Sequence, residues 1–149
     1  RKSELSNQPV LITGGLGFIG SNLAIKLVSL GADVTIIDCM VPGLGGNGRN
    51  VHEIKNKIRI YNIDQRDEKK LKYVITEKKY IFNLAGSVSH IDSMRDPKLD
   101  LSLNTEAHLS LLETCKNIIR TLKSYSPAQD KYMEKSKTAQ QMKPTQSNP

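Results

Sequence analysis

The chain has 149 residues, 38% of them hydrophobic, which suits one domain with a core of ordinary size. No apolar run approaches the ~18 residues of a membrane span, and the polar N-terminus has no apolar stretch, so we expect neither a membrane anchor nor a signal peptide. The net charge of +7 comes from scattered lysines and arginines without interleaved aromatic residues, which argues against nucleic-acid binding.

Short apolar or β-branched runs, bounded by glycine or polar residues, predict four buried strands. These runs are residues 9–13, 33–38, 58–63 and 80–85. A glycine-rich loop over residues 41–50 separates the second strand from the third.

Apolar residues at helical spacing predict three helices. The first follows strand one and is capped at its C-terminus by Gly31, a short second helix follows Asp67, and a long third helix covers residues 99–122. The apolar stripe of the first helix is Ile19, Leu23, Leu27 and Leu30. The stripe of the long helix is Leu109, Leu112, Cys115 and Ile119.

Strands that alternate with helices pair in parallel through right-handed crossovers. The expected fold is therefore α/β, a Rossmann-type doubly wound parallel sheet in the strand order 3-2-1-4 that stops after the fourth strand and its helix. Strands one and four flank the switch point, where such sheets bind ligands. We expect residues 1–123 to form this half-domain, and the polar residues 124–149 to be a linker or a disordered tail.

The strongest motif is the run Thr-Gly-Gly-Leu-Gly-Phe-Ile-Gly over residues 13–20, which follows a predicted strand and opens a helix. Gly14 permits a tight turn, Gly17 lets a pyrophosphate approach the backbone, and Gly20 lets the helix pack close to the sheet. The helix N-terminus offers N–H groups and a partial positive charge to phosphates. We therefore expect a bound dinucleotide here, the alternative being a glycine-rich turn without a ligand.

Asp38 ends the second predicted strand, 18 residues after Gly20. A carboxylate at this place accepts hydrogen bonds from the adenosine ribose hydroxyls. A 2′-phosphate would meet a like charge, and the turn from Gly14 to Gly20 holds no Arg or Lys to offset it. NAD is therefore favoured over NADP, the alternative for Asp38 being an ordinary strand-end residue.

The GxxGxxG spacing, together with the later run Asn83-Leu84-Ala85-Gly86, resembles the short-chain dehydrogenase/reductase superfamily. The motif over residues 13–20 is similar to its extended branch, the NAD-dependent epimerases and dehydratases of nucleotide sugars. Further matches follow in chain order at residues 62–67, 82–86, 96–97, 104 and 111–115. The resemblance covers residues 10–117.

This resemblance implies contacts to the cofactor. Asp64 would accept from the adenine amino group, the backbone of Gln65 would meet the ring, residues 84–86 would form a wall of the groove, and Asn104 would help to hold a proton relay. Plain packing or solvent exposure is the alternative for each of them. The expected cofactor-binding residues are Gly14, Gly15, Gly17, Phe18, Ile19, Gly20, Asp38, Asp64, Gln65, Leu84, Ala85, Gly86 and Asn104. No metal site is expected, because the histidines show no ligand spacing.

The resemblance also implies a catalytic Ser or Thr and a Tyr-x-x-x-Lys pair, which this chain lacks. Tyr125 and Tyr132 are followed four residues later by Gln129 and Ser136. No fifth strand is predicted, so the sheet edge is open. Three explanations stay open: a truncated longer enzyme, omitted intervening segments, or a degenerate module that pairs through its edge. In each case we assign no catalytic residue and expect no turnover by this chain alone.

Two functions are compatible with these features. The first is the NAD-binding part of a nucleotide-sugar epimerase or dehydratase, in which a hydride passes transiently from a sugar to NAD. The second is a non-catalytic Rossmann module for NAD sensing or protein contact. The first implies a nucleotide-sugar substrate, and a homodimer or a second chain is expected to cover the open edge. Cys39 and Cys115, interpreted as thiols, indicate a reducing, cytoplasmic setting.

Overall fold

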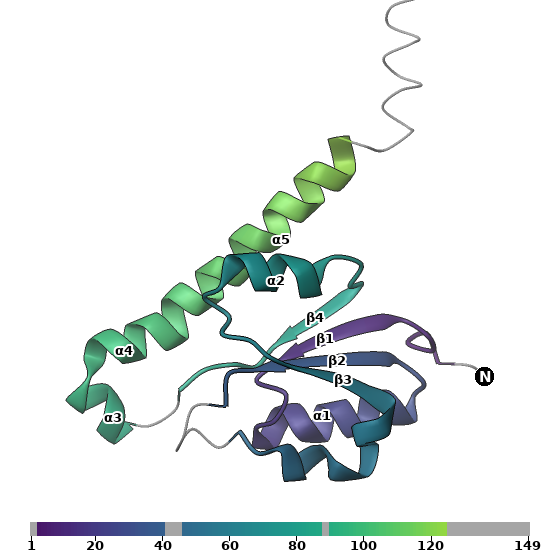
Figure 1. The fold of residues 1–149 in the computed structure, drawn as a ribbon, viewed down its shortest axis with the longest axis horizontal. Helices are drawn as coiled ribbons and strands as arrows, with labels where there is room; N and C mark the ends of the chain where they lie inside the picture. The colour runs from purple at the N-terminus through teal and green to yellow at the C-terminus, as the bar shows by residue number, and fades with distance from the viewer. Residues whose placement is uncertain (1–2, 41–45, 88–89, 125–149) are drawn as a thin grey trace, which may run out of the picture. The chain divides into compact units, whose positions relative to one another are not determined.

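The computed structural model describes residues 3–40, 46–87 and 90–124, and its centre is a four-stranded parallel sheet (Figure 1). The strands lie in the order β3-β2-β1-β4, which confirms the predicted topology. Their bounds are β1 Pro9–Thr13, β2 Asp33–Asp38, β3 Ile58–Asn62 and β4 Tyr80–Asn83. Strand β3 ends one residue before its predicted end, and β4 ends two residues before its own.

Strand β1 is the core of the sheet. It pairs with β2 on one side and β4 on the other, in register from Val10 opposite Val34 and Tyr80. Val10, Leu11 and Ile12 are fully buried. A strand covered on both faces and paired on both edges has no solvent side, which is why its sequence is continuously apolar instead of alternating.

Helix α1, Phe18–Ser29, covers one face of the sheet together with the 3₁₀ helix η1, Gly48–Lys57 (Figure 1). Gly31 follows the end of α1 with φ +83° and donates to the Val28 carbonyl at 3.0 Å, which confirms the predicted cap. The predicted apolar stripe is partly wrong, because Ile19 is 67% exposed. Three of the four buried residues of α1 are small, Gly20, Ser21 and Ala24, and they let the helix lie close to the sheet; the fourth, Leu27, belongs to the core.

The helix η1 lies partly inside the segment that was expected to be a loop. Its Val51 and Ile54 are buried in the core next to α1. Residues 41–45 of the predicted loop lie outside the described residues. The loop prediction failed over residues 48–50 because two buried side chains in a short polar segment give too weak a periodicity to reveal a helix.

Helix α2, Glu68–Ile75, covers the opposite face of the sheet (Figure 1). Asp67 caps it, and the carboxylate accepts a hydrogen bond from the Lys70 amide at 3.2 Å. Leu71, Val74 and Ile75 are buried, as helical spacing predicts.

The predicted long helix is longer and less regular than expected. A short helix α3, His90–Arg95, precedes it, and then α4 (Pro97–Leu101), a π-helical turn η2 (Ser102–Glu106) and α5 (Ala107–Ser124) follow one another. Asp96 caps α4 by accepting from the Leu99 amide at 3.0 Å. The chain divides into two units after Cys115, within α5.

The apolar stripe predicted for α5 is not its buried face. Leu109 and Leu112 are more than half exposed, whereas Leu111 and Ala107 are buried with Thr114. Both sets recur at helical spacing, so periodicity alone does not tell which set meets the sheet. The predicted tail lies almost wholly beyond Ser124, outside the described residues.

No helix in the described ranges combines the length and the apolarity that a membrane crossing requires.

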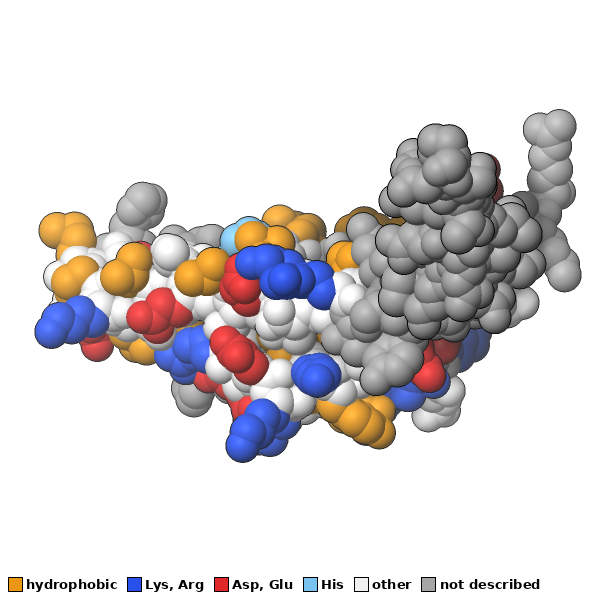
Figure 2. All heavy atoms as spheres, turned by 90° about the horizontal axis from the view of Figure 1, so that it is seen from above, with side chains coloured by type: hydrophobic (Ala, Val, Ile, Leu, Met, Phe, Trp, Pro, Cys, Tyr) orange, Lys and Arg blue, Asp and Glu red, His pale blue; other side chains and the backbone are white. Residues whose placement is uncertain are grey.

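On the face shown in Figure 2, basic side chains lie among acidic and apolar ones.

Candidate functional site

The turn that joins β1 to α1 packs against the backbone that follows β4. Gly14 has φ +63° and donates to the Ile37 carbonyl at 2.9 Å. A Cβ on Gly14 would lie 2.8 Å from backbone atoms of Leu84 and Ala85. Glycine is required here for two reasons, the left-handed conformation and the close approach of a neighbouring chain segment.

Gly20 and Gly17 are glycines for different reasons. A Cβ on Gly20 would overlap the Gly14 carbonyl oxygen, so this position keeps α1 close to the turn. A Cβ on Gly17 would meet only that same oxygen, at 3.4 Å, which is an ordinary contact. Gly17 also has an extended backbone with φ −74°, open to any residue. The protein's own packing does not require glycine at position 17, so the open space above it is available to a ligand.

The first turn of α1 carries neither a side-chain cap nor an acidic residue, and its N-cap is Gly17. Phe18 and Ile19 begin the helix with exposed side chains. The amides and the helix dipole at this end therefore favour a negatively charged ligand.

Asp38 lies at the carboxyl end of β2, facing this turn. Its Oδ2 accepts from the Leu16 amide at 3.1 Å, and its Oδ1 accepts from the Met40 amide at 2.9 Å. A Cβ on Gly46 would lie 3.0 Å from Oδ1, so the chain beyond the loop also passes close to the carboxylate. A carboxylate has about four lone-pair directions, and these two amides leave acceptor capacity toward the groove.

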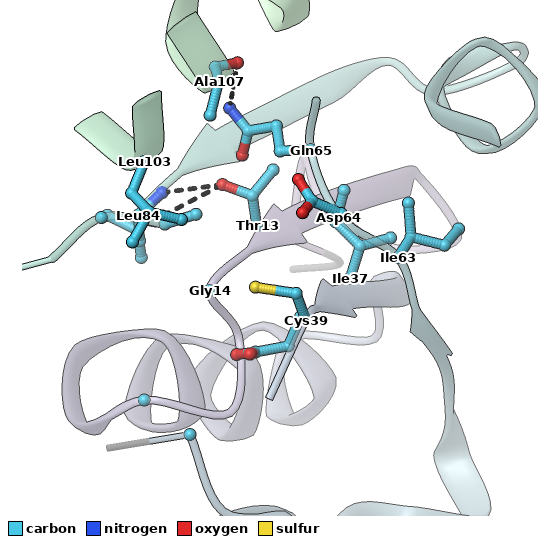
Figure 3. A pocket seen from close by; sticks show the side chains of 15 residues that line it. Thr13, Gly14, Ile37, Cys39, Ile63, Asp64, Gln65, Leu84, Leu103 and Ala107 are labelled. Carbon is cyan, nitrogen blue, oxygen red and sulfur yellow. Dashed lines mark hydrogen bonds between the residues drawn. The ribbon is translucent and has the colours of Figure 1, made fainter. Parts of the chain in front are cut away.

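A groove runs along the carboxyl ends of all four strands (Figure 3). Eight expected residues line it: Gly14, Gly17, Asp38, Asp64, Gln65, Leu84, Ala85 and Gly86. Gly15, Phe18, Ile19, Gly20 and Asn104 do not line it. Gly46 also lines it and belongs to the glycine-rich loop, which the sequence offered as a cover for the adenosine or as a loop without ligand contact. The sequence did not single out the other lining residues as contacts: Thr13, Ile37, Cys39, Ile63, Leu103 and Ala107. Their only sequence signal is their place at a strand end or next to the motif.

Gly15 has a structural role. A Cβ there would lie 2.5 Å from the side chain of Ile36, on the neighbouring strand β2. Its glycine therefore serves the packing of the turn on the sheet, and the residue is buried.

Thr13 organises the wall of the groove that β4 provides. Its hydroxyl donates to Asn83 Oδ1 at 2.5 Å and accepts from the amides of Leu84 and Ala85, both at 3.1 Å. One hydroxyl hydrogen and two lone pairs are thereby all used. Asn83 Nδ2 in turn lies 2.5 Å from His108 Nδ1 on α5. This chain of contacts, invisible in the sequence, fixes the start of the segment 84–86.

Asp64 is held by a residue that the sequence did not mark. Arg66 donates to it from the backbone amide and from Nε, both to Oδ1 at 2.9 Å, and its terminal nitrogen lies 2.5 Å from Oδ2. These hydrogen bonds from the guanidinium lower the pKa of Asp64 below its ordinary value. Arg66 also donates to Ser102 Oγ at 3.0 Å, which ties the end of β3 to η2.

Asn104 is occupied by the chain itself. Its Oδ1 accepts from the Ser87 amide at 2.7 Å, and its Nδ2 donates to the Ser87 carbonyl and to Asp100 Oδ1, both at 3.0 Å. The side chain therefore pins the backbone that leaves β4, beside Gly86. It lies next to the groove without lining it.

Within the described ranges, no group of three or more metal-ligating side chains occurs. Tyr73 lies in α2 and Tyr80 in β4, and neither lines the groove.

Comparison with known proteins gives one family. Residues 11–132 match the family model described as GDP-mannose 4,6 dehydratase. The CDP-paratose 2-epimerase of Salmonella typhi is 34% identical over 113 residues, which cover 72% of this chain and 32% of that protein. The chain thus spans about a third of the length of this curated relative.

Solved structures give the same result. The enzyme WbmF of Bordetella bronchiseptica, in complex with NAD+, matches with 32% identity and a TM-score of 0.70, over 78% of this chain and 34% of WbmF. The UDP-glucose 4-epimerase of Thermus thermophilus, in complex with NAD, matches with 30% identity and a TM-score of 0.65, over 74% of this chain and 34% of the epimerase. The matched region in each is a Rossmann-type α/β fold, as predicted.

Proposed function

The chain belongs to the GDP-mannose 4,6 dehydratase family, within the short-chain dehydrogenase/reductase type of nucleotide-sugar epimerases and dehydratases, and we propose that it is the NAD-binding part of such an enzyme. The observation that carries the proposal is the open space over Gly17, at a helix N-terminus without a side-chain cap. Packing does not account for a glycine there, whereas a pyrophosphate does.

Each part of a dinucleotide has residues in the groove that suit it. The pyrophosphate lies over Gly17 and the first amides of α1, where Phe18 and Ile19 are exposed. Asp38 accepts from the adenosine ribose, and its charge disfavours a 2′-phosphate, so the preferred cofactor is NAD. When bound, NAD supplies a transient acceptor for a hydride from the sugar.

The remaining groove residues serve the base and the wall. Ile63, Asp64 and Gln65 surround the adenine, and the segment 84–86, held by Thr13 and Asn104, forms the wall toward the nicotinamide half. The substrate of the whole enzyme is a nucleotide sugar. A Tyr-x-x-x-Lys pair is absent from this sequence, so turnover requires a segment that supplies one.

Two further properties complete the proposal. Among the described residues no strand pairs with the outer edge of β4. A following strand, a second chain or a second copy of this one covers it, because an open parallel edge invites pairing. The cysteines Cys39 and Cys115 do not form a disulfide with each other, which fits a reducing cytoplasm.

Calorimetric titration of the full chain with NAD and NADP tests the proposal. NAD binds, NADP binds more weakly, and Gly17→Val nearly abolishes NAD binding because a branched side chain fills the pyrophosphate space. Gly48→Val is the matched control, since a Cβ on Gly48 has no atom within 4 Å and lies away from the groove. Normal NAD affinity in the Gly17 variant, or equal loss in both variants, would refute the site.

A further inference from the structure

The helical segment formed by η2 and α5 contacts both ends of the groove wall that follows β4. At one end, Asn104 hydrogen-bonds the backbone amide and carbonyl of Ser87, at 2.7 and 3.0 Å. At the other end, His108 Nδ1 lies 2.5 Å from Asn83 Nδ2. Positions 104 and 108 are four residues apart in consecutive helical turns, so they share one face of the helix. This face therefore holds the segment 83–87 at two points.

The hydrogen bonds of Thr13 decide which way the Asn83 carboxamide faces. The Thr13 hydroxyl accepts from the amides of Leu84 and Ala85, so both of its lone pairs are used. Its single hydrogen must therefore be donated to Asn83. The recipient must be Oδ1, because a carboxamide nitrogen carries hydrogens and does not accept. The Nδ2 of Asn83 is left facing His108 as a donor.

The same reasoning fixes the state of the His108 ring. A donor at Asn83 Nδ2 requires a lone pair on Nδ1, so the ring is neutral and carries its hydrogen on Nε2. In the other neutral tautomer and in the imidazolium, an N–H group would point at the N–H group of Asn83. The position therefore suits a hydrogen-bond acceptor and excludes a donor.

We propose that His108, as the acceptor for Asn83, is a positioning residue for the wall of the cofactor groove. It does not line the groove, whereas Leu84 and Ala85 do. It acts on their amides through the Asn83 carboxamide and the Thr13 hydroxyl. Its effect on cofactor binding rests on the proposed NAD site, and its effect on the wall does not.

Nuclear magnetic resonance tests the contact in the absence of a cofactor. At about pH 8, where an ordinary imidazole is neutral, we expect a scalar coupling across the hydrogen bond between Asn83 Nδ2 and His108 Nδ1. The amide resonances of Leu84 and Ala85 shift in His108→Ala. They return toward the wild-type positions in His108→Asn, whose Oδ1 is attached to Cγ as Nδ1 is. His52→Ala, the same change at an exposed histidine of η1, leaves them in place.

Calorimetric titration with NAD measures the consequence for the groove. His108→Ala weakens NAD binding by about two- to tenfold, the contribution of one neutral hydrogen bond, and His108→Asn restores it. His52→Ala binds NAD as the wild type does. Each variant is titrated at a temperature where it is fully folded, so a change in fold stability alone leaves the affinity unchanged.

The outcomes separate this role from the NAD site. If the wild-type chain does not bind NAD, the NAD site fails, and the amide resonances of residues 84 and 85 still decide whether His108 holds the wall. A neutral ring with its hydrogen on Nδ1 would overturn the role, and this readout in the wild-type chain stands even if His108→Ala does not fold. Unchanged NAD affinity in His108→Ala, or an asparagine variant as weak as the alanine variant, would overturn it as well.

Discussion

Replacing Thr13 with valine removes the hydroxyl at the junction of β1 and β4 while keeping the shape of the side chain. Thr13 is completely buried, and its hydroxyl makes three hydrogen bonds. The Leu84 amide keeps a second partner, the Thr13 carbonyl at 3.2 Å. The Ala85 amide and Asn83 Oδ1 lose the partner that Thr13 gave them.

Two polar groups left without that partner cost roughly 1–3 kcal/mol each. Asn83 and Ala85 are half-buried, so the lower part of this range applies. The expected loss is about 2–3 kcal/mol, a large fraction of the 5–15 kcal/mol stability of a typical domain. Thr13→Ser keeps the hydroxyl and loses one buried methyl, about 1 kcal/mol.

Urea unfolding followed by circular dichroism measures both variants. Thr105→Val provides a matched control, because Thr105 is exposed on η2. The expected order of stability is wild type and the control, then Thr13→Ser, then Thr13→Val. If valine at position 13 is as stable as serine, the hydroxyl does not hold the wall of the groove, and the assignment of Thr13 as its organiser is wrong.

Four further changes test other parts of the structure. Asp38→Ala is expected to weaken NAD binding by about 1–2 kcal/mol in calorimetry, and unchanged affinity would remove Asp38 from the site. Gly20→Ala should cost about 1–3 kcal/mol of stability, since its Cβ overlaps the Gly14 carbonyl. Gly31→Ala should cost about 1–2 kcal/mol because φ there is +83°; a neutral effect in urea unfolding would contradict the cap. The wild type should exceed Arg66→Gln in stability most clearly above pH 4, roughly the unfolded carboxyl pKa. The folded pKa of Asp64 is depressed, so this advantage declines as pH falls below the unfolded carboxyl pKa and through that lower value. A difference in stability that does not change with pH would contradict the ion pair.

The elements that the sequence predicted well are those governed by local rules. The turn after β1, the cap at Gly31 and the short helix after Asp67 each depend on the backbone conformation or the hydrogen bonds of a few consecutive residues. The strand order follows from the alternation of elements and the handedness of crossovers, which leave few topologies. A glycine pattern in such a context therefore locates the groove with little further information.

The elements that it predicted badly depend on contacts between distant segments. Leu109 and Leu111 both belong to helical stripes of α5, and only the packing of Ala107 against the end of β3 decides which one is buried. The sequence marked Asp64 as an acceptor, yet it gave no sign that Arg66 would engage it. Side-chain partners at the ends of different strands become visible only in three dimensions.

Some residue types at the groove are explained by contacts within the protein, and others are not. Gly14 and Gly20 are explained by the chain itself, since added atoms would collide with its own backbone. The chain itself does not explain Gly17 or Gln65. Gly17 leaves space that a side chain could fill, and Gln65 Oε1 has no hydrogen-bond partner among the described residues. Where a residue type costs stability and no contact within the protein explains it, a ligand contact is expected to explain it. Both residues line the same groove, so one ligand lying along it would contact both.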